Sequence, residues 1–567
     1  MKFVNQFVLA ASIFGLSFLG LSSGNTAVSA GSMPSPTPTP ATRPRTTPTV
    51  SPTPTPAEAS TPTPTPSTKR SQTLEELQSK IRQRLFDPAV RRGRVGVKIV
   101  SLSSGKVIFE QDSEKYFMPA SNMKNFTVAA AMEKLGPDFK FVTSVYANAL
   151  PDSSGTIKGD LRVYGRGDVS ISTAFFGTSP SDPDTYYKGI DRLVDRIAAA
   201  GVKKIEGGIL GDESYFKGFY LPAGWEWDDL QAYYGAEVSA LPINDNAVDI
   251  NVSPGTSGSP CYVTISPANK IVQVVNTCAT GSPSSTRTLS VVKKLDRNII
   301  EVSGSMPAGK PAYINSIAIT RPAELFVALL KRRLEATGIV VTGDSRLLPP
   351  NIKPTQNIEV AKLESPPFAQ IAAKTMKPSQ NMFTETVLWT LGVEDNREKM
   401  KGISVPSVSD GTQFVSPPPR EDSSALGINA IKAFLKEIGA ADDGIIQYDG
   451  SGLSRHDLIT PSAVVTLYTY MAKQSKNAQA WRESLTIAGV DGTLANRLKG
   501  TAAEANFRGK TGTIDQVSAL SGYMTTASGE QLVVSIIVNN VGGVARTRTS
   551  LADDIVTALA NFNGKID

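Results

Sequence analysis

The chain has 567 residues, of which 40% are hydrophobic, and its formal net charge at pH 7 is +6. This length suggests about two to four domains, and the hydrophobic content is ordinary for a soluble protein with packed cores. The charge is small for the length and no dense basic run is present, so nucleic acid is not expected as a partner.

The supply of histidine and cysteine argues against two kinds of active site. The sequence contains one histidine, His456, and two cysteines. A Ser-His-Asp triad would have to use His456, and a His/Cys zinc site lacks enough ligands, so neither a metal nor another cofactor is expected. A serine nucleophile in this chain is therefore expected to use a lysine as its base.

Residues 1–30 have the pattern of a secretory signal peptide. Lys2 precedes an apolar run from Phe7 to Leu21, and small residues at Val28-Ser29-Ala30 offer a cleavage site. An uncleaved membrane anchor is the alternative, although the apolar run is short for a membrane span. We therefore expect export to the periplasm or another extracytoplasmic part of the cell envelope.

Residues 31–72 form a tract of proline, threonine and serine with repeated Thr-Pro dipeptides. Such a composition cannot build a core, so it predicts an extended, polyproline-like linker. Two interpretations stay open for it, a stalk that reaches through the outer layers of the envelope and a spacer without a specific role.

The first folded segment is predicted at residues 73–140. Thr73 and Glu76 have the spacing of a capping box, and the apolar residues that follow mark one face of a helix up to Leu85. Two strand-like runs come next, Arg94 to Leu102 and Lys106 to Gln111, and the Ser-Ser-Gly between them predicts a hairpin.

The next helix is predicted to open in the stretch MPASNMK, residues 118–124. Pro119 suits the first turn of a helix, and the alanine-rich continuation to Leu135 predicts that the helix is buried. Residues three apart lie on one helix face, so Ser121 and Lys124 should be neighbours. A lysine can take the proton of a serine hydroxyl if burial or a second cation lowers its pKa. This stretch therefore predicts a serine nucleophile with its base.

The spacing alone is a weak signal, because Ser-x-x-Lys also occurs at Ser103 to Lys106 and at Ser290 to Lys293. The first of these lies in the predicted hairpin turn, and the second lies in an alternating, strand-like stretch. Neither opens a helix, and for any single match the alternative is a surface serine beside a solvated lysine.

Residues 141–348 are dominated by short strand-like runs and turns, which predict a large, mostly β insert in the domain that contains Ser121. A smaller β module is expected inside it at about residues 250–315, and a helix at Arg321 to Ala336. Both cysteines lie in the module, and export makes a Cys261–Cys278 disulfide plausible, with two free cysteines as the alternative.

Residues 349–567 are expected to complete the domain that the first segment begins. Ser379-Gln380-Asn381 precedes an apolar, helix-like run, and by itself it also fits a plain helix cap after a proline. Lys510-Thr511-Gly512 lies between turn residues and a strand-like run, and a Pro/Ser/Gly loop is expected at 401–419. A buried strand at Leu532 to Asn539 and a closing helix then predict a helix–sheet–helix sandwich made from the two ends of the chain.

Ser-x-x-Lys, Ser-x-Asn and Lys-Thr-Gly, in this order, are the motif set of penicillin-binding proteins and class A β-lactamases. From about residue 73 onward the chain resembles the penicillin-binding protein 4 type of D-alanyl-D-alanine carboxypeptidase/endopeptidase, the S13 peptidase family. The large insert between the first two motifs is typical of that family and argues against an ordinary β-lactamase. Further stretches that share the family's look are Tyr234–Glu237, Ser239–Leu241, Asp449–Arg455, Asp491–Leu494 and Ser518–Tyr523.

The resemblance implies an α/β (α+β) fold with a discontinuous, transpeptidase/β-lactamase-like helix–sheet–helix catalytic domain and an insert of two nested domains. One departure is Gln380, where Asp is more usual in the family. Because this middle position of the motif is the variable one, the departure does not argue against activity.

By the same resemblance, Ser121 attacks the carbonyl of the penultimate D-alanine of a substrate and Lys124 is the base. Ser379 relays a proton to the leaving amine, and Asn381 holds either Lys124 or the substrate amide. Lys510 supplies positive potential that lowers the pKa of Lys124 and attracts the terminal carboxylate of the substrate.

The substrate-binding residues implied are Thr511, Gly512 and Thr513, of which the two threonines bind that carboxylate. Backbone N–H groups of Ser121 and Thr513 form the oxyanion hole. Water then hydrolyses the acyl-enzyme, and a β-lactam forms an ester that the site releases slowly.

Trp225-Glu226-Trp227-Asp228-Asp229 and Tyr233, here called the acidic-aromatic patch, lie in the insert. The resemblance suggests that part of the patch borders the site, with Asp228 as the counter-charge for the amine of the diamino acid. A packed aromatic cluster with solvated acids is the alternative. Arg455 and His456 form a wall of the cleft in one interpretation. In the other, Arg455 fixes its own loop.

The resemblance thus implies serine-type hydrolysis of D-Ala-D-Ala ends, or of cross-links, in peptidoglycan stem peptides, with β-lactam antibiotics as covalent inhibitors. Two alternatives stay open, a cell-wall-binding protein with a vestigial site and a β-lactamase- or esterase-like hydrolase. The complete motif set favours the peptidase.

Overall fold

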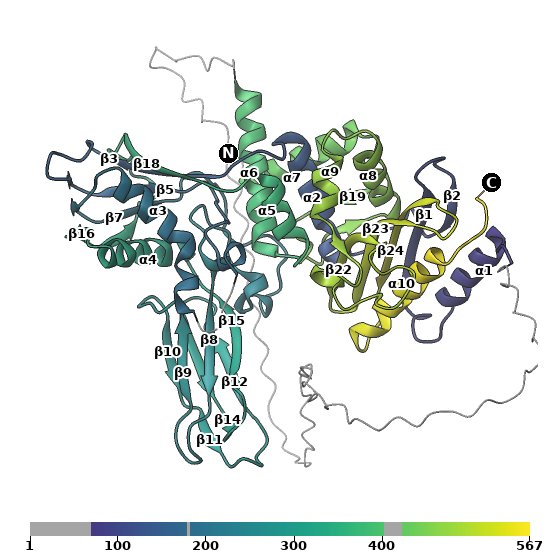
Figure 1. The fold of residues 1–567 in the computed structure, drawn as a ribbon, viewed down its shortest axis with the longest axis horizontal. Helices are drawn as coiled ribbons and strands as arrows, with labels where there is room; N and C mark the ends of the chain where they lie inside the picture. The colour runs from purple at the N-terminus through teal and green to yellow at the C-terminus, as the bar shows by residue number, and fades with distance from the viewer. Residues whose placement is uncertain (1–69, 178–181, 402–421, 567) are drawn as a thin grey trace, which may run out of the picture. The chain divides into compact units, whose positions relative to one another are not determined.

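The computed structural model describes residues 70–177, 182–401 and 422–566 (Figure 1). These residues belong to one compact unit that begins at Arg70. The predicted signal peptide, the predicted linker up to residue 69, and all but the first residue of the predicted 401–419 loop lie outside the described residues.

A six-stranded antiparallel sheet, with the order β2-β1-β24-β23-β22-β21, forms the centre of the catalytic domain. Its strands are β1 (Arg94–Ser101), β2 (Val107–Gln111), β21 (Thr486–Ile487), β22 (Arg508–Ile514), β23 (Val517–Thr525) and β24 (Gln531–Asn539). β1 pairs with β24 along its whole length, from Arg94 opposite Asn539 to Ser101 opposite Leu532. The predicted hairpin and the predicted buried strand are confirmed, and the two ends of the chain share one sheet.

Helices cover both faces of this sheet (Figure 1). One face carries α1 (Leu74–Leu85) and α10 (Ala545–Ala560). The core on the opposite face contains α2 (Lys124–Lys134), α5 (Phe368–Met376), α6 (Asn381–Met400), α7 (Ser423–Glu437), α8 (Pro461–Lys473) and α9 (Ala478–Ser484). Along β24, Val534 belongs to the first core and Val533 to the second, as the two-residue period of a strand requires. The predicted helix–sheet–helix sandwich is confirmed.

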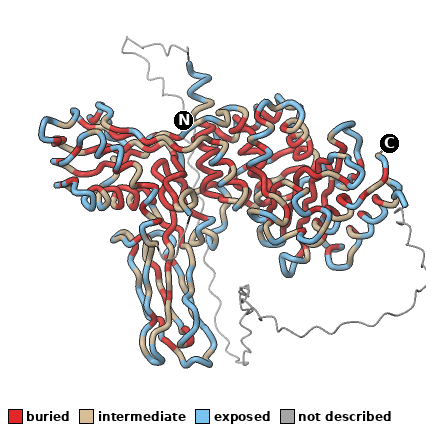
Figure 2. The backbone as a smooth tube through the Cα atoms, in the orientation of Figure 1, coloured by how far each residue is buried: buried red, intermediate tan, exposed pale blue. Residues whose placement is uncertain are grey.

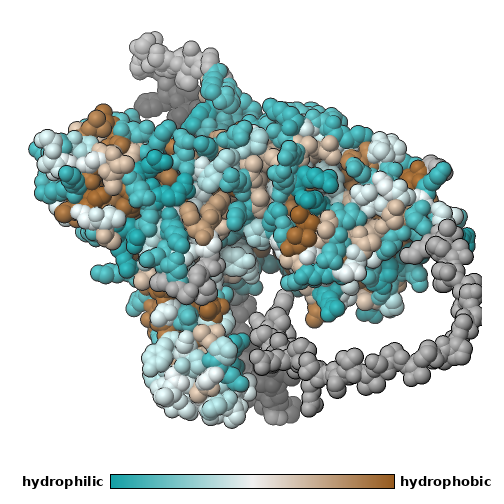
Figure 3. Space-filling model, viewed as in Figure 1, coloured by the Kyte–Doolittle hydropathy of each residue, from teal (hydrophilic) through white to brown (hydrophobic). Residues whose placement is uncertain are grey.

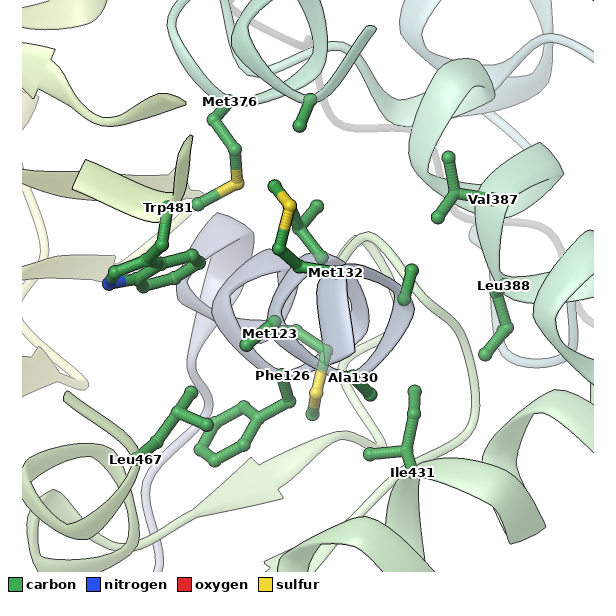
Figure 4. Close-up of a cluster of buried hydrophobic side chains, with 14 of the residues drawn as sticks. Met123, Phe126, Ala130, Met132, Met376, Val387, Leu388, Ile431, Leu467 and Trp481 are labelled. Atoms are coloured by element: carbon green, nitrogen blue, oxygen red, sulfur yellow. The ribbon is translucent and has the colours of Figure 1, made fainter. Parts of the chain in front are cut away.

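α2 is the most enclosed of these helices, and every residue from Lys124 to Met132 is buried. Figure 4 shows apolar side chains of five neighbouring helices around it: Met376 of α5, Val387 and Leu388 of α6, Ile431 of α7, Leu467 of α8, and Trp481 of α9. Each such side chain contributes about 1.5–3 kcal/mol when it is fully buried. The start of α2 is therefore held rigidly.

The insert is built on a five-stranded sheet of the order β17-β7-β5-β3-β18 and a three-stranded sheet of the order β16-β6-β4. Its strands are β3 (Val142–Ala147), β4 (Thr156–Lys158), β5 (Leu161–Tyr164), β6 (Lys204–Glu206), β7 (Ile209–Asp212), β16 (Val340–Val341), β17 (Ser345–Leu347) and β18 (Ile358–Glu364). Its helices are α3 (Lys188–Ala199) and α4 (Pro322–Ala336), and Pro322 starts α4 as expected.

β18 corrects the expected boundary between insert and catalytic domain. We placed the return of the catalytic domain at residue 349, but β18 pairs antiparallel with β3. A chain that leaves a sheet along its edge can come back as a neighbouring strand, and such pairing carries no local sequence signal. The insert therefore extends to Glu364, and α5 is the first helix of the second catalytic segment.

The nested β module contains three small sheets, with the orders β15-β8-β9, β10-β13-β12 and β11-β14. Its strands are β8 (Ala247–Ser253), β9 (Tyr262–Ser266), β10 (Gln273–Asn276), β11 (Ala279–Gly281), β12 (Ser290–Lys293), β13 (Ile299–Ser303), β14 (Ser305–Pro307) and β15 (Tyr313–Ala318). Cys261 and Cys278 form the predicted disulfide. The apolar residues of the module join the same core as α3 and α4, while Figure 2 shows exposed loops at its far end.

In the part of the chain that the structure describes, no helix combines the length and the apolar character that a membrane span needs. On the face seen in Figure 3, hydrophobic residues form small, separate groups among hydrophilic ones.

Candidate active site

Ser121 lies in η1 (Ala120–Met123), a single turn of 3-10 helix directly before α2. Side chains three apart are eclipsed in a 3-10 helix, so this turn places Lys124 over Ser121. Lys124 Nζ lies 3.0 Å from Ser121 Oγ, within hydrogen-bonding distance. Ala120 has a φ of 46°, a conformation that costs a non-glycine residue on the order of 1–3 kcal/mol and that the surrounding packing must maintain.

Lys124 also binds two segments far away in the sequence. Its Nζ donates to Asn381 Oδ1 at 2.6 Å and to the carbonyl oxygen of Ser451 at 2.8 Å. Asn381 is the first residue of α6, and its Nδ2 donates to the carbonyl oxygen of Tyr234 at 2.9 Å. Asn381 therefore contacts Lys124, one of the two partners expected for it.

Lys510 of β22 is fully buried beside this group. Its Nζ donates to Ser379 Oγ at 2.9 Å and to the carbonyl oxygen of Thr511 at 2.8 Å. Asn122 Nδ2 donates to the carbonyl oxygen of Lys510 at 3.2 Å, which connects β22 to the turn that carries Ser121. The fold thus brings the three sequence motifs together.

Gly512 allows β22 to approach that turn closely. A Cβ atom at this position would lie 2.6 Å from the carbonyl oxygen of Pro119 and 3.1 Å from the backbone nitrogen of Ser121. Any side chain would therefore push Lys510 and Thr513 away from Ser121, which explains the glycine in the third motif.

Burial is the main electrostatic influence on both lysines. It lowers the pKa of Lys124 to about 7, against the opposite effect of the carboxyl groups of Asp449, Glu385 and Asp457. Burial also lowers the pKa of Lys510 well below its usual range, and Lys124 adds to that shift. We expected Lys510 to lower the pKa of Lys124, but desolvation is the larger cause and the like-charge effect falls on Lys510.

Buried carboxyl groups accompany Lys124 on the side away from the cleft. Glu385 accepts backbone N–H groups from Gly450 at 3.0 Å and from Ser451 at 2.7 Å. Asp449 accepts backbone N–H groups of its own turn. Burial and the nearby Asp449 raise the pKa of Glu385, while hydrogen bonds from Gly450 and Ser451 and the charge of Lys124 oppose this shift and favour the carboxylate. Burial raises the pKa of Asp457 well above the usual range of an aspartate.

The second motif serves two purposes at once. Gln380 Oε1 accepts the backbone N–H of Met382 at 3.3 Å and so caps α6, while its Nε2 donates to Asp245 Oδ2 of the insert at 2.8 Å. The flanking residues Ser379 and Asn381 accept hydrogen bonds from Lys510 and Lys124, respectively. Ser379 has a φ of 67°, a left-handed conformation that is uncommon for a serine and that tends to occur at functional sites.

A cleft of about 1180 Å³ leads from Ser121 to the insert. It is lined by Ser121, Trp225, Glu226, Trp227, Asp228, Asp229, Tyr233, Tyr234, Pro378, Ser379, Asn381, Gly452, Leu453, Arg455, Thr513, Ile514, Asp515 and Gln516. The acidic-aromatic patch therefore borders the site. Trp225 Nε1 donates to Asp449 Oδ2 at 2.8 Å, which anchors the patch to the buried carboxyl groups.

Arg455 connects two walls of this cleft. Its Nε donates to Glu226 Oε2 at 3.0 Å, and its Nη1 donates to the carbonyl oxygen of Asp515 at 3.2 Å. The interpretation that Arg455 fixes its own loop is wrong, because both partners belong to other segments. His456 does not line the cleft, and its ring packs near that of Tyr448 with the centroids 5.2 Å apart.

A smaller arm of about 250 Å³ lies beside the nucleophile, lined by Ser121, Ser379, Thr493, Arg497, Thr511, Thr513 and Thr549. The hydroxyl groups of Thr493 and Thr511 are 2.6 Å apart. Within the described residues, no cluster of three or more His, Cys, Asp or Glu side chains is placed to bind a metal ion.

Comparison with known proteins identifies the family of this fold and site. The model of the D-Ala-D-Ala carboxypeptidase 3 (S13) family matches residues 77–410 and 413–561. The chain belongs to this family. A D-alanyl-D-alanine carboxypeptidase from Actinomadura sp. (strain R39) is 32% identical over 505 residues, which are 87% of this chain and 86% of that protein.

Two further matches come from Haemophilus influenzae. Its D-alanyl-D-alanine carboxypeptidase DacB is 28% identical to this S13 chain over 454 residues, 78% of the chain and 85% of that protein. The crystal structure of its penicillin binding protein 4 (dacB) matches with a TM-score of 0.69 and 25% identity, over 87% of this chain and 100% of that chain. The S13 chain is a serine-type D-Ala-D-Ala carboxypeptidase, a hydrolase of the penicillin-binding type.

Several groups that surround Lys124 in the site were not singled out in the sequence analysis. Glu385 did carry a signal, because it follows Asn381 by four residues and is an ionisable residue in an apolar helix. The carbonyl group of Ser451 carried none, since any residue supplies a carbonyl oxygen. Asp457 lies just beyond the stretch Asp449–Arg455 that resembled the family, and nothing local marks it as buried.

Proposed function

We propose that this protein removes the terminal D-alanine of peptidoglycan stem peptides through an acyl-enzyme on Ser121. One observation carries the proposal: Lys124 Nζ lies between Ser121 Oγ and Asn381 Oδ1, with the Lys510–Ser379 pair beside them. Two buried amines next to one partly exposed hydroxyl fit nucleophilic catalysis and have no evident structural purpose.

In the first step, the neutral amine of Lys124 accepts the proton of Ser121 while Oγ attacks the carbonyl carbon of the penultimate D-alanine. The negative charge that develops on the carbonyl oxygen is stabilised by the backbone N–H groups of Ser121 and Thr513. Each donor of this kind contributes about 3 kcal/mol to transition-state stabilisation.

As its C–N bond breaks, the leaving D-alanine takes up the proton that Lys124 accepted from Ser121, so Lys124 returns to the neutral amine. Ser379, whose hydroxyl accepts from Lys510 Nζ, relays this proton. The substrate carboxylate binds to the hydroxyl groups of Thr511 and Thr513, and its charge favours the ammonium form of Lys510. Water then attacks the acyl carbon and gives a proton to Lys124, which passes it to Ser121 Oγ as the ester C–O bond breaks, so the shortened peptide is released and the free enzyme is restored.

The acidic-aromatic patch receives the opposite end of the substrate. Asp228 is exposed within the cleft and pairs there with the free amine of a diamino acid in the stem peptide. The same acyl chemistry splits cross-links when the leaving group is the amine of a second stem peptide, so we propose D,D-endopeptidase activity as well. β-Lactams acylate Ser121 in place of the substrate.

We propose that the protein acts outside the cytoplasm, in the periplasm or elsewhere in the cell envelope. The signal-peptide pattern of residues 1–30 supports this location, and so does the disulfide between Cys261 and Cys278. The expected substrate, the cell wall, lies in the same compartment.

A fluorescent penicillin tests the proposal. Wild type should be labelled covalently, Ser121→Ala should lose labelling by at least about 1000-fold, and Ser290→Ala, which alters another Ser-x-x-Lys match, should label as wild type does. Absence of labelling in folded wild type would support a binding protein with a vestigial site, and rapid release of the drug would support a β-lactamase.

Mass spectrometry of peptidoglycan fragments after incubation then identifies the reaction. Loss of one terminal alanine from stem peptides is the expected outcome for the carboxypeptidase. Conversion of cross-linked dimers to monomers is the expected outcome for the endopeptidase, and if dimers persist while alanine is released, the endopeptidase activity is absent.

A further inference from the structure

The proposed reaction does not use the buried carboxyl groups near Lys124, yet one of them binds the segment that holds this amine. Glu385 lies on α6 four residues after Asn381, so both side chains are on one face of the helix. Asn381 accepts a hydrogen bond from Lys124 directly. Glu385 is fully buried one turn further along, where it faces the turn that contains Ser451.

The hydrogen bonds of Glu385 determine how that turn presents its carbonyl group. Both carboxylate oxygens accept the N–H of Gly450 at 3.0 Å, and Oε1 accepts the N–H of Ser451 at 2.7 Å. Ser451 in turn offers its carbonyl oxygen to Lys124 Nζ at 2.8 Å. The carbonyl oxygen of Gly450 accepts from Thr127 Oγ1 of α2 at 2.8 Å, so the same turn is fixed from both sides.

We propose that Glu385 is a positioning residue for the catalytic amine, which orients the Ser451 carbonyl that binds Lys124 and supplies a buried counter-charge to the ammonium. This inference rests on the proposed role of Lys124 as the base. A buried carboxylate is costly unless it is paired and hydrogen-bonded. The two backbone N–H groups and the nearby amine supply that compensation.

Other charged groups face Lys124 as well, and they differ from Glu385 in what they bind. Asp449 accepts backbone N–H groups of Gly452 and Ser454, the indole N–H of Trp225 and, at 3.4 Å, the hydroxyl but not the N–H of Ser451. Asp457 accepts the N–H groups of residues 448 and 449, and Lys510 approaches from β22. Of these carboxyl groups, all of which lie in described residues, only that of Glu385 accepts the N–H of Ser451, the residue whose carbonyl oxygen binds Lys124 Nζ.

The test compares Glu385→Gln with wild type and with Glu398→Gln, an exposed glutamate of the same helix. The rate of acylation by a fluorescent penicillin is measured from pH 5 to 9. In Glu385→Gln the NH2 group faces the N–H of Gly450 in either orientation of the amide, and the negative charge is absent. The maximal acylation rate should fall by at least about tenfold, because the amine of Lys124 is displaced. The midpoint of the pH profile should move to lower pH by about half a unit or more, because the ammonium form of Lys124 loses a counter-charge. Glu398→Gln should follow wild type.

Glu385→Asp is the second variant, because it keeps the charge but is too short to reach both N–H groups. Its midpoint should stay at the wild-type pH while its maximal rate falls, and this result decides the matter if Glu385→Gln does not fold in a thermal melt. A uniform loss of rate without a shift in Glu385→Gln, a shifted midpoint in Glu385→Asp, or wild-type profiles in both would overturn the inference. Failure of wild type to be labelled would instead contradict the proposed function.

Discussion

The two sides of the cleft are built in opposite ways. The catalytic side, defined as Ser121, Lys124, Ser379, Asn381 and Lys510, contains two amines that are 0% exposed and are held by hydrogen bonds of 2.6 to 3.0 Å. The acidic-aromatic patch opposite projects into solvent. Its Trp227 is 71% exposed.

This difference separates chemistry from recognition. The amines on the catalytic side owe their lowered pKa values to dehydration, so their function depends on tight packing around α2. The acidic-aromatic patch is anchored by Trp225 and by the Glu226–Arg455 pair, while Trp227 and Asp228 are exposed where they line the cleft. Changes on the catalytic side should therefore cost far more activity than changes in the patch.

The largest effect is expected from Lys124→Met, which keeps the length of the side chain but removes the base. Acylation should slow by about 100- to 10,000-fold, the usual contribution of general base catalysis. The thermal midpoint should fall as well, because Asn381 Oδ1 and the Ser451 carbonyl lose their donor and Glu385 loses the amine that compensates its burial. Stopped-flow labelling and a thermal melt measure both. Lys134→Met is the matched control, since Lys134 is on the same helix and pairs with Glu437 at the surface. If Lys124→Met were acylated at nearly the wild-type rate, another group would have to be the base.

The pH dependence of wild type sharpens the comparison next. Lys124 must be neutral to accept a proton, and its pKa is lowered to about 7. Below this pKa the active fraction falls about tenfold per pH unit, so acylation should rise with pH up to about 7 and then level off. A rate that declines from pH 6 to pH 8 would mean that the active form of Lys124 is the ammonium.

The β module provides a region that can be destabilised without touching either side of the cleft. Replacing both cysteines, Cys261→Ser with Cys278→Ser, should lower the stability of the module by about 2–4 kcal/mol, as removal of a disulfide generally does. Acylation at 25 °C should stay within about twofold of wild type, because neither cysteine lines the cleft. Calorimetry and labelling rates check this, and slow acylation by the folded variant would mean that the module supports the cleft.

The smallest effect is expected from Asp228→Asn in the acidic-aromatic patch. An exposed ion pair contributes about 0.2–1 kcal/mol, so KM for a peptide with a free amine should rise by only a few fold while kcat stays the same. The matched control is the same peptide with its amine acetylated, for which the variant and wild type should agree. An equal rise in KM for both peptides would rule out a charge contact with the amine.

Local patterns accounted for much of the fold. The capping box at Thr73, the hairpin of β1 and β2, Pro322 at the start of α4 and the strand β24 all follow from short stretches of sequence. The prediction for the insert boundary was wrong. The sequence of β18 would suit a strand of the catalytic sheet as well as one of the insert, and only its pairing with β3 decides where it belongs.

For the site, the sequence by itself determined which side chains carry the chemistry, because Ser121 and Lys124 are neighbours in one turn and the single histidine left lysine as the base. Only the tertiary structure decided the chemical state of that lysine. Helices from both ends of the chain exclude water from Lys124. The carbonyl group of Ser451 and the carboxyl group of Glu385, which act on its amine, come from segments more than 250 residues away. Burial and long-range contact are properties of the whole packed domain, and no short stretch encodes them.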